Sequence, residues 1–69
     1  MSELIFLVEE DPEGGYTARA LGQSIFTEGE TWDELKKKVQ EAVACHFEGE
    51  AERPTMVRLH LVHDEVVCL

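Results

Sequence analysis

Carboxylates are the residues of this chain whose type and spacing could do chemistry. Four follow an apolar run closely: Glu9, Glu10, Asp11 and Glu13. Two more, Glu28 and Glu30, flank Gly29. Carboxylates hold a divalent cation when they converge from separate elements, and they contact basic protein surfaces when they lie on solvated loops. Because the first four form one continuous run around Pro12, we interpret both groups as surfaces for a partner.

Other residues could suggest an enzyme, but their spacing does not support one. His60 lies on a predicted strand and His63 directly follows it. While the strand stays regular through His63, the two side chains point to opposite faces and do not chelate one ion. Cys45 and His46 are neighbours on a predicted helix, where successive side chains diverge too far for a nucleophile–base pair. The sequence has no G-x-S-x-G, phosphate loop or dinucleotide turn. We predict no catalytic residue, no metal ligand and no cofactor.

The charge and hydropathy of the chain indicate which partners and which cellular compartment to expect. Fifteen acidic and six basic residues give a formal net charge of −9 over 69 residues. Such a chain is repelled by phosphate backbones, so direct nucleic-acid binding is not expected. The longest apolar run is too short for a bilayer, and the acidic N-terminus is unlike a signal peptide. We expect a cytoplasmic protein away from membranes, with Cys45 and Cys68 reduced and partly buried.

The carboxylates must be positioned by four strands and one helix. Alternating apolar residues predict strands over 2–9, 16–21, 24–28 and 56–62, and a period of 3.6 predicts a helix from Trp32 to about residue 48. Thr31 and Glu34 predict a capping box at the start of that helix. Gly29 is expected to supply a permissive backbone before it. Trp32 fits either the core or an interface.

This order predicts a single domain over residues 1–69 with an α+β, two-layer fold. One helix would cover one face of an antiparallel-type sheet. The other face would then expose apolar side chains drawn from Ile5, Leu7, Ile25 and Val62. A patch of this kind in water drives association, so we predict a homodimer, a tetramer or another homo-oligomer.

Four collinear segments resemble the HicB-like antitoxin family, in its stand-alone, UPF0150-type form. They are FLVEE at 6–10, GYTA at 15–18, FTEGETWDEL at 26–35 and VQEAV at 39–43. Members share an apolar strand, a Gly-[Tyr/Trp]-x-Ala strand, a T-x-G-D/E-T turn into a helix, and E-A-I/V later in that helix. The resemblance covers about residues 5–48. The segment LGQSI at 21–25 differs from the family's usual P-x-L-P-G run.

The resemblance implies a fold like a trimmed ribonuclease H that lacks the catalytic carboxylates. It also implies the antitoxin of a type II toxin–antitoxin pair, which binds HicA, a small basic mRNA-cleaving toxin, and occludes its active site. The acidic surface suits that role because it can mimic RNA phosphates. The predicted contacts are Glu9, Glu10, Asp11, Glu13, Glu28 and Glu30. Two alternatives stay open: a metal-dependent nucleic-acid hydrolase using Glu9, Asp11 and His63, and an oligomeric interaction module without a toxin.

Overall fold

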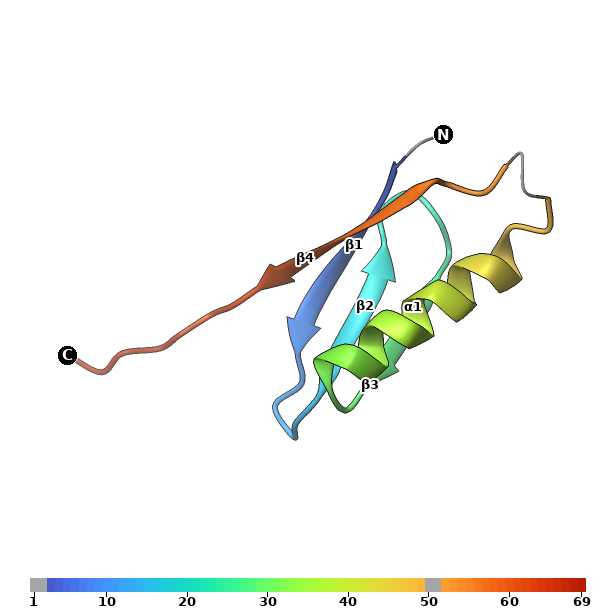
Figure 1. Ribbon diagram of the computed structural model, residues 1–69. Coiled ribbons are helices and arrows are strands. Elements are labelled where there is room, and N and C mark those ends of the chain that lie inside the picture. Colours follow the sequence, from blue (N-terminus) through green and yellow to red (C-terminus); the bar gives the residue numbers. More distant parts are fainter. Residues whose placement is uncertain (1–2, 50–51) are drawn as a thin grey trace.

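The computed structural model describes residues 3–49 and 52–69, which fold as β1–β2–β3–α1–β4. The elements are β1 Glu3–Glu10, β2 Tyr16–Ala20, β3 Phe26–Gly29, α1 Trp32–His46 and β4 Met56–Val62. The described strands form one sheet in the order β3-β2-β1-β4, with α1 on one face (Figure 1). The predicted α+β fold and element order are confirmed. Ser2, in the predicted first strand, lies outside the described residues.

The sheet is mixed. β1 and β2 pair antiparallel, with Leu7 opposite Arg19, and β2 and β3 also pair antiparallel. β4 runs parallel to β1, with Phe6 opposite Leu59. The antiparallel arrangement expected from the sequence therefore holds for β1, β2 and β3 and not for β4. The cause is the crossover: α1 carries the chain back along the sheet, so the next strand starts at the same end as β1.

The start of α1 follows the predicted capping chemistry in part. The Thr31 hydroxyl accepts a hydrogen bond from the backbone N–H of Glu34 at 3.1 Å, which satisfies one donor of the first turn. The Glu34 carboxylate does not complete the box, because it lies 3.7 Å from Lys38 Nζ, one turn further on. The helix ends at His46, with Phe47 as an extended C-cap, somewhat before the predicted end.

Gly29 is required for a reason that the sequence did not indicate. The glycines with positive φ among the described residues are Gly14, Gly15 and Gly22, so Gly29 needs no left-handed backbone and that expectation was wrong. A Cβ at Gly29 would instead lie 2.7 Å from the backbone nitrogen of Leu35. The helix therefore packs directly on the end of β3, where a side chain has no room.

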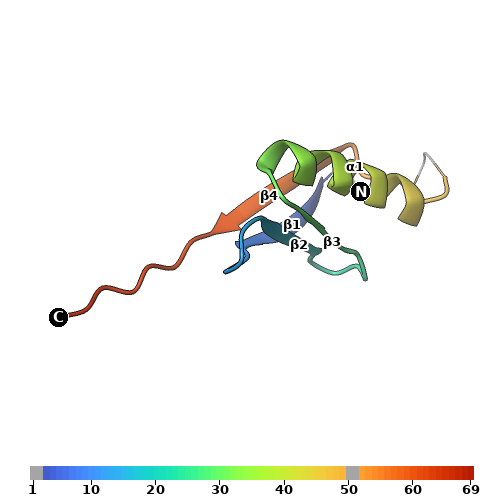
Figure 2. The ribbon, with the colours of Figure 1, turned by 90° about the horizontal axis from the view of Figure 1, so that it is seen from below.

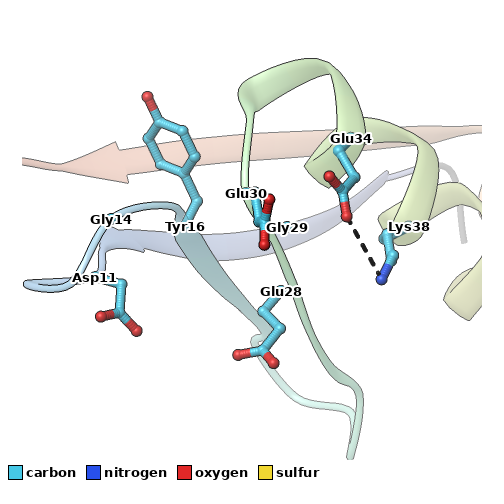
Figure 3. A pocket seen from close by; sticks show the side chains of 8 residues that line it. All are labelled: Asp11, Gly14, Tyr16, Glu28, Gly29, Glu30, Glu34 and Lys38. Carbon is cyan, nitrogen blue, oxygen red and sulfur yellow. Dashed lines mark ion pairs between the residues drawn. The ribbon is translucent and has the colours of Figure 1, made fainter.

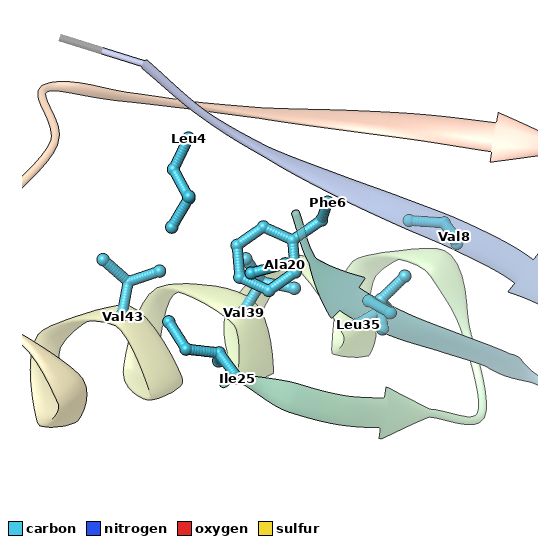
Figure 4. Packing of buried hydrophobic residues seen from close by; sticks show 9 residues of the cluster. Leu4, Phe6, Val8, Ala20, Ile25, Leu35, Val39 and Val43 are labelled. Atoms are coloured by element: carbon cyan, nitrogen blue, oxygen red, sulfur yellow. The ribbon is translucent and has the colours of Figure 1, made fainter. Parts of the chain in front are cut away.

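Side chains from β1, β2 and α1 form the core between the helix and the sheet (Figure 4). Phe6, Val8 and Leu35 are fully buried. The complete cluster is Leu4, Phe6, Val8, Ala18, Ala20, Ile25, Leu35, Val39 and Val43. Trp32 packs against this cluster, and its ring meets that of Tyr16 edge-on at 5.3 Å between centroids. The core interpretation of Trp32 is therefore the one that the structure supports.

The uncovered face of the sheet differs in detail from the expectation. Ile25 lies in the core, while Phe26 is 64% exposed. Arg19 on β2 pairs with Leu7 of β1 on one side and with Phe26 of β3 on the other. Ile5, Leu7 and Val62 are half-buried on that face. Both cysteines are exposed, and the prediction of partial burial was wrong. Position 45 lies on the solvent side of α1, and position 68 lies beyond the last strand.

The C-terminal segment, residues 63–69, continues from β4 and projects away from the rest of the domain (Figures 1 and 2). It makes the molecule long and thin, with extents of 52 × 20 × 18 Å. This stretch is an extended tail beyond β4, and its apolar side chains are exposed. No helix in the described part of the chain is long and apolar enough to cross a membrane.

Candidate functional site

Carboxylates from two connections line one cavity at one end of the sheet. The β1–β2 turn and the β3–α1 junction lie on either side of a cavity of about 270 Å³ (Figure 3). Its lining contains four carboxylates and one ammonium group. The lining residues are Asp11, Gly14, Tyr16, Glu28, Gly29, Glu30, Glu34 and Lys38. We call this cavity the acidic pocket.

Strand pairing brings the two connections together. In the β2–β3 ladder Tyr16 lies opposite Gly29, and Thr17 lies opposite Glu28. The turn that precedes Tyr16 is therefore beside the junction that follows Gly29. Gly15 permits the close approach, because it has a φ of +88° and a Cβ there would lie 2.8 Å from the Gly29 carbonyl oxygen. Carboxylates that are distant in the sequence thus share one pocket.

Asp11 is held in place by its own turn. Its Oδ1 accepts a hydrogen bond from the backbone N–H of Glu13 at 2.9 Å. Its carbonyl accepts from the Gly14 N–H, and its own N–H donates to the Gly15 carbonyl, both at 2.9 Å. Aspartate favours such turns because its side chain can satisfy a nearby backbone donor. The turn uses Oδ1 and leaves Oδ2 as an acceptor for a ligand in the pocket.

The charges of the acidic pocket are only partly balanced. Glu34 and Lys38 form the ion pair at 3.7 Å, which places the one ammonium group on the helix side. Within residues 3–49 and 52–69, neither Glu28 nor Glu30 has a basic partner, and both are exposed. Unpaired carboxylates around a small hollow bind an ammonium or guanidinium group by charge-assisted hydrogen bonds. The arrangement is thus suited to a lysine or arginine of a partner.

The structure divides the six carboxylates predicted to bind a partner into separate groups. Asp11, Glu28 and Glu30 line the acidic pocket. Glu9 and Glu10 line a second cavity of about 140 Å³ beside the end of β4. There Glu10 Oε1 lies 3.2 Å from Nδ1 of His63, so it already has a partner. Glu13 is exposed in the hairpin turn.

Five lining residues were not predicted as site residues from the sequence. They are Gly14, Tyr16, Gly29, Glu34 and Lys38. The spacing of Glu34 and Lys38 is the i, i+4 interval at which side chains meet on a helix, and it could have revealed their ion pair. Tyr16 offers no such signal, because its place depends on which strand lies beside β2.

The ligand set suggested for a hydrolase is not brought together. Asp11 lines the acidic pocket, whereas Glu9 and His63 line the second cavity. In the described part of the chain, no three His, Cys, Asp or Glu side chains are grouped so that they could hold a metal ion. A metal-dependent mechanism needs oxygen or nitrogen ligands that converge on one point. The three residues suggested for the hydrolase therefore lie in two cavities and do not form one ligand set.

These features define a small α+β domain with one helix, a mixed sheet and an acidic pocket. A UPF0150 protein of Archaeoglobus fulgidus is 60% identical over 53 residues, covering 77% of this chain and 77% of that protein. A UPF0150 protein of Thermotoga maritima is 37% identical over 67 residues, covering 97% of this chain and 93% of that protein. The chain belongs to the UPF0150 family. No protein-family model matches it. No solved structure matches it either.

Proposed function

We propose that this protein is a non-enzymatic antitoxin that binds a small basic protein in the cytoplasm. The proposed partner is a HicA-like, mRNA-cleaving toxin of a type II pair, as the resemblance of residues 5–48 to HicB-like antitoxins implies. The observation that carries the proposal is the acidic pocket. Asp11, Glu28 and Glu30 line it, and the last two have no basic partner within the described residues.

The proposed mechanism is occlusion by charge mimicry. A ribonuclease must present cations to hold RNA phosphates, and carboxylates at similar positions can satisfy those cations instead. One lysine or arginine of the toxin would enter the acidic pocket, and the net charge of −9 would speed encounter with a basic surface. Bound in this way, the domain excludes RNA from the toxin without any chemical step.

The direct test is co-expression with a HicA-like, lysine-rich protein, followed by capture on an affinity tag. We expect a stable complex, and we expect it to be lost when Glu28→Lys and Glu30→Lys are combined. The matched control combines Glu41→Lys and Glu48→Lys, which make the same charge change at exposed positions outside the acidic pocket. Absence of a complex, together with RNA cleavage by this domain that depends on divalent ions, would support the hydrolase instead.

Self-association is the second part of the proposal. The helix covers only one face of the sheet, and Phe26 and Met56 are 64% and 57% exposed. Side chains of this size in water favour contact with another apolar surface. A homo-oligomer would bury part of this surface and would present more than one acidic pocket to its toxin.

A further inference from the structure

The chain exposes more surface than a folded monomer of its size. Its accessible surface is 5283 Å², whereas a compact protein of 7.8 kDa exposes about 4,400 Å². The excess of about 900 Å² is close to the roughly 800 Å² that each partner buries in a standard interface. The radius of gyration is 13.5 Å, against about 11 Å for a compact chain of 69 residues. The shape is that of a subunit without its partner.

The most exposed large apolar side chains belong to the C-terminal tail, residues 63–69. Val66 is 92% exposed, Val67 is 66% exposed and Leu69 is fully exposed. Next to the tail, β4 pairs with β1 on one side, and over the described residues no strand pairs with its other side. A free edge exposes a row of backbone donors and acceptors that readily accepts another strand.

We propose that two copies of this chain exchange their C-terminal tails. Each tail adds as an antiparallel strand to the free edge of β4 in the other copy, and the two sheets join into one. β4 and the tail then form one long strand that pairs with its own copy about a two-fold axis. The contact is isologous and closes on itself, so it gives a dimer and not a fibre.

Symmetry limits the register of this pairing. Residues directly opposite each other in an antiparallel pair point to the same face. A two-fold axis perpendicular to the sheet leaves each side chain on the same face of the sheet in both copies. Each residue can therefore pair only with a residue an even number of positions away in the sequence, or with its own copy. The axis must then pass between one residue and the same residue of the partner. With the axis at Val62, the whole of β4 is covered by the partner's tail. Val57 then lies opposite the partner's Val67, Met56 opposite the partner's Cys68, and His60 opposite the partner's Asp64.

The register at Val62 is favoured by its side-chain pairs. It has two apolar pairs and one pair of opposite charge when His60 is protonated. An axis at His63 would instead place the carboxylates of Asp64 and Glu65 opposite Val62 and Leu61. Three pairs at Val62 are mismatched: Leu59 lies opposite the partner's Glu65, Arg58 opposite the partner's Val66, and Leu61 opposite the partner's His63. Lys36 lines the same small cavity as Leu59, between α1 and β4, and supplies a cation there.

This inference takes up the self-association within the proposed function and assigns it to the free edge of β4 instead of the sheet face that carries Phe26. It does not require the toxin. Its test is the molar mass of the chain alone, by size-exclusion chromatography with light scattering. We expect the full chain near twice 7.8 kDa, and a chain ending at His63, or one carrying Val67→Asp, near the monomer mass. Phe26→Asp is the matched control: Phe26 is exposed on β3, the opposite edge of the sheet, so the dimer should persist.

A monomeric full chain would overturn the inference, and so would a dimer that survives loss of the tail. Dissociation by Phe26→Asp alone would assign the contact to the uncovered sheet face. Circular dichroism of each variant shows whether it remains folded. The measurement uses no toxin, so a monomeric chain would contradict the tail exchange without contradicting toxin binding. A monomer that captures the toxin would show that toxin binding does not need the dimer.

A cysteine pair tests the register. In a Cys45→Ser background, Met56→Cys should form a disulfide with the partner's Cys68 under mild oxidation, giving a covalent dimer on a non-reducing gel. Directly opposite residues have the Cβ separation that allows such a bond with a small adjustment. Adding Cys68→Ser should abolish the covalent dimer. A covalent dimer that persists without Cys68 would contradict the proposed register.

Discussion

Gly29 and Leu35 are in direct backbone contact: a Cβ on Gly29 would lie 2.7 Å from the Leu35 nitrogen and 2.9 Å from its Cα. This contact fixes the first turn of α1 on the end of β3. Leu35 is fully buried, so the helix cannot lift without exposing it. The same junction carries Glu28 and Glu30 into the acidic pocket. The stability of the fold and the geometry of the pocket therefore depend on one glycine.

We predict that Gly29→Ala destabilises the protein by about 1–3 kcal/mol, the usual cost of forcing a methyl group into a packed site. The cost is not offset by helix or strand propensity, because the methyl would meet backbone atoms that cannot rotate away. Urea unfolding followed by circular dichroism measures it. Gly49→Ala is the control: its Cβ would have no atom within 4 Å, and we expect a change within about 0.5 kcal/mol. Equal stabilities for the two variants would refute the close contact.

Much of the fold could be predicted from local signals. β4 occupies the predicted residues, and α1 starts at the predicted Trp32 with Thr31 as its cap. Both follow from patterns within a few residues, period two for β4 and period 3.6 for α1. Direction and neighbours of β4 were not predictable in the same way. The direction of β4 and its neighbouring strand depend on how α1 crosses the sheet, and no local sequence pattern indicates that.

The candidate site could be predicted only in part. The sequence singled out Asp11, Glu28 and Glu30 for their charge and their loop positions. It could not show that they share a pocket, because that depends on Tyr16 lying opposite Gly29 in a long-range ladder. For the same reason it grouped Glu9 with Asp11, whereas the chain direction at the end of β1 places them in different cavities. Proximity in sequence was a poor guide to proximity in space.

Glu3 and Arg58 form a two-pronged ion pair across the β1–β4 ladder, with distances of 3.0 and 3.1 Å. The hydrogen bonds from Arg58, with its positive charge, hold the pKa of Glu3 below its ordinary value of 4.5. A carboxyl with a lowered folded-state pKa stabilises the fold above its unfolded-state pKa, and this contribution is lost as pH falls through the lower value. We therefore predict that the free energy of unfolding falls less on acidification in Glu3→Gln than in the wild type.

Urea unfolding at neutral pH and at a pH below 4.5 measures this dependence. Arg58→Ala should reduce the pH dependence of the unfolding free energy to the same extent. The double variant should show no further reduction, because both substitutions remove the same interaction. The effect is small, since the pair is exposed and screened by solvent. An acid response that is the same in Glu3→Gln and in the wild type would show that the pair does not contribute.

The acidic pocket should give toxin binding a characteristic salt dependence. We predict that Glu28→Gln combined with Glu30→Gln weakens the complex about tenfold at low salt, as expected for two exposed charges. The loss should shrink as salt rises, because exposed charges are screened. Isothermal titration calorimetry at two salt concentrations measures both effects. Glu41→Gln with Glu48→Gln is the charge-matched control. An equal loss in the control would assign the effect to net charge alone.

The central claim is that this domain inhibits a basic ribonuclease by binding it. The most direct measurement is RNA cleavage by a purified HicA-like toxin as this protein is added. The account predicts that cleavage stops near an equimolar ratio, and that the Glu28→Lys, Glu30→Lys variant fails to stop it while the Glu41→Lys, Glu48→Lys variant succeeds. Cleavage that continues at its full rate in an excess of the wild-type protein would contradict the account.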